Sequence, residues 1–88
     1  MVERNLVICN ELGLHARAAA KFVKCASGYQ AEICICKGTL EVNGKSIMGV
    51  LLLAAPKGSS VVIRSDGPDE DAALAALEAL ISDGFGEG

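Results

Sequence analysis

The fold of this 88-residue chain is restricted most by the way strand-like and helix-like hydrophobic patterns alternate along it. Strand-like runs, with β-branched residues or a two-residue alternation, occupy residues 2–9, 31–37, 40–42 and 60–65. Helical spacing or helix-start signals mark residues 16–26, 47–55 and 68–83. A chain of this length buries one modest core, so we expect a single domain over residues 1–88, with the order β-α-β-β-α-β-α.

The clearest helix lies near the end of the chain. Pro68 suits its first turn, the acidic residues 69–71 suit its positive end, and Gly84 suits its C-terminal cap. Its expected buried stripe is Leu74, Leu77, Leu80 and Ile81.

The two central strands indicate which face of a sheet the helices cover. Their alternation places Ile33 and Ile35 on one side, and Val61 and Ile63 on one side of the later strand. Each of the first and last helices has one apolar stripe, which favours helices packed on one face of an antiparallel sheet. We therefore predict an α+β open-faced two-layer sandwich, with a four-stranded antiparallel sheet and three helices on one face. The side chains of Cys34, Cys36 and Arg64 then point to the bare face.

Composition and charge argue against nucleic-acid binding. The formal net charge is −3, which disfavours binding to the phosphate backbone of a nucleic acid. The chain has one tyrosine, two phenylalanines and no tryptophan, so it has few side chains on which bases could stack. The charge is uneven, because residues 1–64 hold all eight basic residues and four acidic ones, whereas residues 65–88 hold seven acidic and no basic residues. The basic region therefore lies in the same part of the chain as the only histidine.

Neither an export signal nor a membrane-spanning segment is visible, since the longest apolar run covers only residues 50–56. We expect a cytoplasmic monomer without membrane insertion, whose four cysteines are reduced thiols. Cys34 and Cys36 lack the C-x-x-C spacing of zinc sites, so no metal and no cofactor are expected. A small metal-handling domain that uses these two thiols is a weaker alternative.

The stretch "GLHARAA" places the single histidine, His15, where a helix is about to begin. The first turn of a helix has unpaired N–H groups and the positive end of the helix dipole, and it binds phosphate readily. A histidine there, with Arg17 nearby, fits a side chain that accepts a phosphoryl group and then loses it to a partner. The alternatives are an exposed capping residue without chemistry and, less well supported, a metal ligand.

A second helix start lies at Ser46, which is well placed to cap a helix beginning at Ile47. That helix, "IMGVLLLAA", is apolar on every side, so one side can pack on the sheet while the other faces a partner. Ile47, Met48 and Leu51 could form the outward patch, and methionine suits surfaces that adapt to several partners. The alternative is that all three residues fill the core.

Three segments of the chain resemble one known family: "GLHARAAAKFV", "VNGKSIMGVLLLAAPKGSSVVI" and "GPDEDAALAALEALI". Together they are similar to the HPr family, the histidine-containing phosphocarrier proteins of the bacterial phosphoenolpyruvate-dependent phosphotransferase system. The resemblance covers nearly the whole chain, and the family has the same open-faced sandwich fold that the patterns predict.

The resemblance implies a role for each matching residue. His15 corresponds to the histidine that the phosphorylated general enzyme of the system phosphorylates on Nδ1, and Arg17 to the arginine that compensates the phosphoryl charge. Ser46 matches the serine that an ATP-dependent kinase modifies in many members. The positions that dock downstream sugar-specific or regulatory partners correspond to Ala20, Lys24, Ile47, Met48 and Leu51.

One position departs from the commonest family pattern. Many members have proline where this chain has Ala18, although alanine also occurs there, particularly in the nitrogen-related branch. Sugar uptake and nitrogen-type regulation therefore both stay open. A branch of the family that cannot carry phosphate has another residue at this position, so the presence of His15 favours a working carrier. We expect a stoichiometric carrier and not an enzyme, because the single histidine has no acid/base partner and the chain has no nucleotide-binding loop. The alternative from another class is a non-catalytic regulatory binding module that acts through the apolar patch at residues 47–51 and Ser46.

Overall fold

Four strands and three helices alternate along the residues that the computed structural model describes, 1–87. Their bounds are β1 (Val2–Val7), α1 (Ala16–Ser27), β2 (Glu32–Lys37), β3 (Leu40–Asn43), α2 (Ile47–Leu52), β4 (Ser60–Asp66) and α3 (Glu70–Ser82), followed by a short 3-10 turn, η1 (Gly84–Gly86). The helices are 12, 6 and 13 residues long. Among the described residues none of them is long and apolar enough to cross a membrane.

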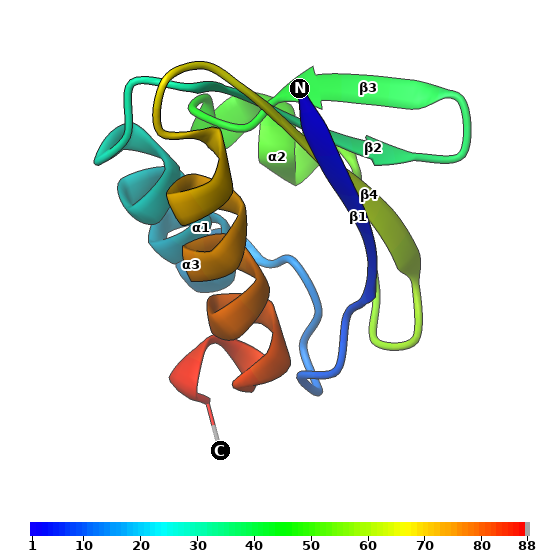
Figure 1. Ribbon diagram of the computed structural model, residues 1–88. Helices are drawn as coiled ribbons and strands as arrows, with labels where there is room; N and C mark the ends of the chain where they lie inside the picture. The colour runs from blue at the N-terminus through cyan, green and yellow to red at the C-terminus, as the bar shows by residue number, and fades with distance from the viewer. Residues whose placement is uncertain (88) are drawn as a thin grey trace.

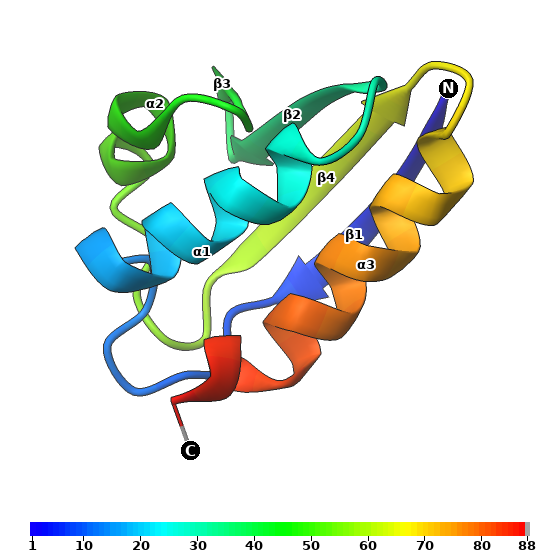
Figure 2. The same cartoon turned by 90° about the vertical axis from the view of Figure 1, so that its left-hand side faces the viewer.

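The strands form one antiparallel sheet in the order β1-β4-β2-β3. All three helices lie on one face of this sheet, with α1 and α3 side by side and α2 next to α1 (Figures 1 and 2). The predicted α+β open-faced sandwich is therefore confirmed. Because β4 is central, it joins the N-terminal strand to the β2–β3 hairpin.

The core lies between the helices and the covered face of the sheet. Ile35 of β2 and Ile63 of β4 are opposite each other in the sheet register and are fully buried, as predicted. Phe22 of α1 and Leu77 of α3 are completely buried above them. In the predicted stripe of α3, Leu80 is only partly buried.

Cys36 differs from Cys34 and Arg64, the other two residues predicted on the uncovered face of the sheet. It is buried although no helix covers it, whereas Cys34 is partly buried and Arg64 is exposed. Its thiol contacts a carboxylate oxygen of Glu41 at 3.7 Å, and the guanidinium of Arg64 donates to the same oxygen at 2.9 Å. Charged side chains from the flanking strands β3 and β4 thus screen this thiol from solvent.

Two predicted helix boundaries are wrong. Helix α2 ends at Leu52 instead of Ala55, because Ala54 takes a left-handed conformation with φ of 47° that a helix cannot continue. Helix α3 begins at Glu70, so Pro68 lies before the helix and not in its first turn. The carboxylate of Asp69, at the cap, accepts backbone N–H bonds from Gln30 and Ala31 instead of capping its own helix.

Candidate functional site

His15 is the N-cap residue of α1, as the sequence predicts. Its backbone is extended, with φ of −80° and ψ of −178°, and its ring turns back toward the helix. Nδ1 accepts the backbone N–H of Arg17 at 3.4 Å, a long contact. The ring nitrogen therefore lies at the end of the helix where unpaired N–H groups and the positive dipole favour an anion.

Gly13 allows the chain to approach this cap closely. Its φ is +66°, and a Cβ at this position would lie 2.4 Å from the carbonyl oxygen of Ala55 and 2.8 Å from Cα of Pro56. The next residue, Leu14, donates its N–H to the same Ala55 carbonyl at 2.9 Å. The loop before α1 is thus packed tightly against the loop after α2, and only glycine fits at the contact.

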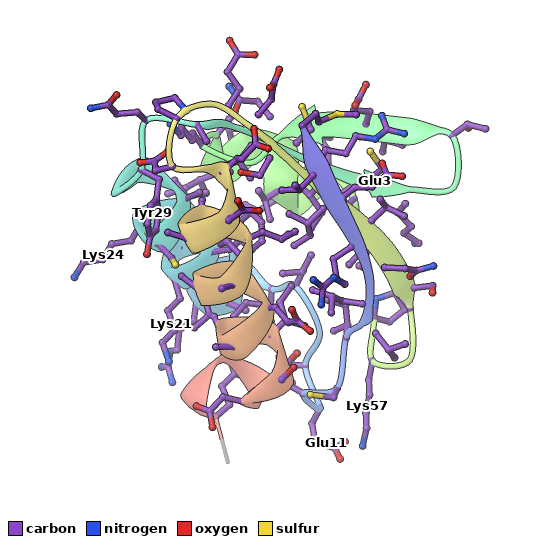
Figure 3. The ribbon with its side chains drawn as sticks, viewed as in Figure 1. Glu3, Glu11, Lys21, Lys24, Tyr29 and Lys57 are labelled. Carbon is purple, nitrogen blue, oxygen red and sulfur yellow. The ribbon has the colours of Figure 1, made fainter. Side chains whose placement is uncertain are left out.

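The His15 ring lies in an open cavity of about 1060 Å³, which has room for a phosphoryl group. Residues 9–12, the first residues of α1 and the C-terminal segment line this cavity. Its charged lining groups are of both signs: Arg17, Lys21, Lys57, Glu11, Asp83 and Glu87. Glu11 and Lys57 lie next to each other at its rim and form an ion pair at 2.7 Å (Figure 3).

Glu87 is the site residue that the sequence reasoning missed. Its Oε2 lies 2.6 Å from Nε2 of His15, and its Oε1 accepts a hydrogen bond from Nδ2 of Asn10 at 3.0 Å. The C-terminal segment turns back beside the loop that precedes α1, which brings these residues together (Figure 2). No local motif points to a contact across 72 residues. The one feature of the sequence that could have indicated the position of this segment is the aromatic Phe85, which is fully buried and fixes the segment to the core.

The pKa of the Glu87 carboxyl lies below its ordinary value of 4.5, because Asn10 and His15 both hydrogen-bond to it. Such bonds stabilise the ionised form. Glu87 is therefore a carboxylate at neutral pH and faces the imidazole as an anion.

The basic residues of α1 have different environments. Lys21 and Lys24 both extend from α1 away from the sheet (Figure 3). Lys24 and Arg17 are exposed, whereas the Lys21 ammonium donates to the backbone carbonyl of Phe85. Lys21 thus holds the C-terminal segment beside the site.

Ser46 occupies the second predicted cap, and its Oγ accepts the N–H of Gly49 at 3.2 Å. Beside it, Ile47 and Met48 are 45% and 71% exposed, whereas Leu51 is half-buried and packs against the core. Leu52, which the sequence reasoning did not single out, is 67% exposed. We call Ile47, Met48 and Leu52 the α2 patch.

The α2 patch and the His15 cap belong to neighbouring helices, because α2 packs beside α1 (Figure 2). Leu12 and Pro56 line a small hollow between His15 and the end of α2. Ala20 and Lys24, the α1 positions predicted to dock partners, are both exposed.

All four cysteines are free thiols. Within residues 1–87, no group of three histidine, cysteine or acidic side chains has an arrangement that could hold a metal ion. The metal-handling alternative thus gains no support from the geometry.

The comparisons with known proteins agree with one another. The family model described as PTS HPr component phosphorylation site matches residues 2–83. The phosphocarrier protein HPr of Neisseria meningitidis is 48% identical over 88 residues, which cover 100% of this chain and 99% of the relative. The phosphocarrier protein NPr of Shewanella violacea is 43% identical over 86 residues, 98% of this chain and 94% of the relative. The crystal structure of HPr from Thermoanaerobacter tengcongensis superposes with a TM-score of 0.97 at 43% identity, covering 100% of this chain and 99% of that one.

Proposed function

Since the chain belongs to the HPr family and is a phosphocarrier of the phosphotransferase system, we propose that His15 is the residue that carries its phosphoryl group. The general enzyme of the system, itself phosphorylated, is the proposed donor, and downstream sugar-specific or regulatory proteins are the acceptors. The observation that carries the proposal is the position of the His15 ring, with Nδ1 at the N-terminus of α1 and beside an open cavity.

The start of α1 supplies what a phosphoryl group on Nδ1 requires. The phosphoryl oxygens carry negative charge, and the helix end offers N–H donors and a positive dipole. Arg17 is exposed two residues into the helix, and its guanidinium would compensate the remaining charge. The phosphoryl group stays available to the next protein because the cavity is open.

The protein is in this proposal a stoichiometric carrier and not an enzyme. Each transfer leaves His15 phosphorylated until an acceptor takes the group, after which the ring returns to its original state. We propose a single carrier domain that acts in the cytoplasm, where the donor and acceptor proteins of such a system work.

The docking surface proposed for these partners combines α1 and α2. Ala20 and Lys24 are exposed on α1, and the α2 patch adds an apolar area with Leu51 at its base. Arg17 and Lys24 favour acidic partner surfaces, so the rate of phosphoryl transfer is expected to fall as salt concentration rises.

Ser46 is the proposed regulatory phosphorylation site for a serine kinase. A phosphate on the cap of α2 is compatible with the helix end and leaves the fold intact. It would add about −1.5 to −2 charges next to the α2 patch. Repulsion of an acidic partner would then slow phosphoryl transfer to His15.

A second candidate function is a regulatory binding module that acts without carrying phosphate. The exposure of Met48 and Leu52 favours it, because an apolar surface of this kind suits protein binding whatever happens at His15.

The test is intact-mass spectrometry after incubation with phosphoenolpyruvate and a general enzyme of the phosphotransferase system. We expect one acid-labile phosphate on the wild type and none on the His15→Ala variant. If an enzyme that phosphorylates another carrier leaves both proteins unmodified, the regulatory module becomes the better proposal.

A further inference from the structure

Glu87 is held against His15 by more than one contact. Its two carboxylate oxygens bind different partners, Nε2 of His15 at 2.6 Å and Nδ2 of Asn10 at 3.0 Å. The same Asn10 amide donates to the carbonyl of Gly13 at 2.8 Å, and Lys21 holds the backbone of Phe85 two residues before Glu87. The carboxylate is therefore fixed in place, and its side chain is only 15% exposed.

These contacts select one tautomer of the imidazole ring. An ionised carboxylate can only accept hydrogen bonds, so the hydrogen of a neutral His15 ring lies on Nε2. On the other side of the ring, the N–H of Arg17 points to Nδ1, which must then hold a lone pair. Two independent contacts thus leave Nδ1 as the nitrogen with the free electron pair.

We propose that Glu87 is a positioning residue for phosphoryl transfer, which fixes the hydrogen of His15 on Nε2 and stabilises the positive ring that forms when Nδ1 is phosphorylated. This inference rests on the proposed function, in which Nδ1 accepts the phosphoryl group.

The electron balance of the step shows why a carboxylate at Nε2 helps. The Nδ1 lone pair forms the new bond to phosphorus, while the bond between phosphorus and the donor breaks and its electron pair leaves with the donor. The hydrogen on Nε2 stays in place, so the ring gains a positive charge. Glu87 already faces that charge at hydrogen-bond distance.

The position of Glu87 also limits its repulsion of the incoming phosphoryl group. It lies at Nε2, on the opposite edge of the ring from Nδ1, whereas the backbone N–H of Arg17 faces Nδ1. The other glutamate of the cavity, Glu11, is engaged by the Lys57 ammonium at 2.7 Å. Glu87 is thus the acidic residue whose contact with the ring serves the reaction.

The test is the Glu87→Gln variant, which keeps the shape of the side chain but removes its charge. An amide can donate or accept, so it does not select one tautomer. We expect ring ¹⁵N chemical shifts to report a smaller Nε2–H fraction for His15. The rate of phosphoryl uptake from the general enzyme should fall about tenfold, since a charge-assisted hydrogen bond is replaced by a neutral one.

Glu78→Gln is the matched control, because Glu78 forms a comparable ion pair with Arg4 at 2.9 Å outside the cavity. It should change neither the tautomer nor the rate. An uptake rate for Glu87→Gln that equals or exceeds the wild-type rate would overturn the proposal, as would an unchanged tautomer. A wild type that takes up no phosphate would instead be a failure of the proposed function, and the ¹⁵N shifts would still decide whether Glu87 sets the ring hydrogen.

Discussion

Helices α1 and α2 begin with similar caps but differ in what surrounds these caps. In both, an extended cap residue accepts a backbone N–H from the next turn, His15 from Arg17 at 3.4 Å and Ser46 from Gly49 at 3.2 Å. The His15 cap, however, lies in a cavity lined by charged groups of both signs. The Ser46 cap lies beside the exposed apolar residues of the α2 patch.

If His15 is the phosphoryl acceptor, as we propose, this difference indicates that a helix cap alone does not make a reaction centre. The dipole and the N–H donors are present at both helix starts. What distinguishes α1 is an open cavity that Arg17 helps to line and a carboxylate that binds Nε2 of the ring. The α2 cap has the exposed apolar α2 patch beside it instead, so in the proposed function a charge placed there acts on binding.

The largest expected effect comes from moving the histidine between the two caps. In the double variant His15→Ala/Ser46→His, an imidazole occupies the α2 cap and none occupies the α1 cap. We expect complete loss of phosphate uptake, because the second cap lacks the cavity and a fixed carboxylate partner. Intact-mass spectrometry after incubation with the general enzyme measures the result, with circular dichroism to establish that the variant folds. One phosphate on the double variant would mean that an imidazole at a helix cap is sufficient for phosphate uptake.

The next effect concerns Gly13, which packs the loop before α1 against the loop after α2. We expect Gly13→Ala to lower the free energy of unfolding by about 3 kcal/mol. An alanine here would have to adopt a left-handed backbone conformation, and its Cβ would lie 2.4 Å from the Ala55 oxygen. Gly38→Ala is the control, because Gly38 has a similar φ of +61° and no atom within 4 Å of its Cβ position. That change should cost about 1 kcal/mol. Urea denaturation measures both, and equal losses would show that the contact with Ala55 is unimportant.

Local signals in the sequence were sufficient for both caps and for the sheet. His15 and Ser46 each precede a helical pattern, and the alternation around Ile35 and Ile63 identified the covered face correctly. These features depend on neighbouring residues along the chain, which hydrophobic periodicity reports directly.

The features that the sequence did not reveal depend on contacts between distant segments. Helix α2 ends because Ala54 adopts a left-handed conformation, and the loop that follows α2 packs against the loop before α1. The Glu87–His15 contact requires the C-terminal segment to turn back at Gly84, with φ of +61°, and to bury Phe85. Periodicity predicts that a helix ends near Gly84, but it contains no information about where the following residues pack.

A smaller effect is expected from charge at the second cap. Aspartate and asparagine both cap helices well, so Ser46→Asp and Ser46→Asn differ almost only in one negative charge. We expect Ser46→Asp to accept phosphate from the general enzyme about fivefold more slowly than Ser46→Asn, because one exposed charge contributes about 1 kcal/mol at contact distance. The difference should shrink in high salt. Equal rates for the two variants at low salt would contradict electrostatic regulation at this cap.

The smallest effect separates the α2 patch from apolar exposure in general. Met48 is 71% exposed on α2. Val7, the last residue of β1, is 56% exposed on the face of the sheet that the helices leave bare. If the patch docks the general enzyme, Met48→Ala removes contact area, whereas Val7→Ala removes an apolar side chain outside the proposed docking surface. We expect Met48→Ala to raise the carrier concentration needed for half-maximal phosphorylation about threefold, the modest cost of truncating a contact outside a binding hot spot. Val7→Ala should leave it unchanged. Because His15 remains intact in both, the maximal rate should stay near the wild-type value, and a fall in that rate for Met48→Ala would mean that α2 acts on the reaction centre and not on docking alone.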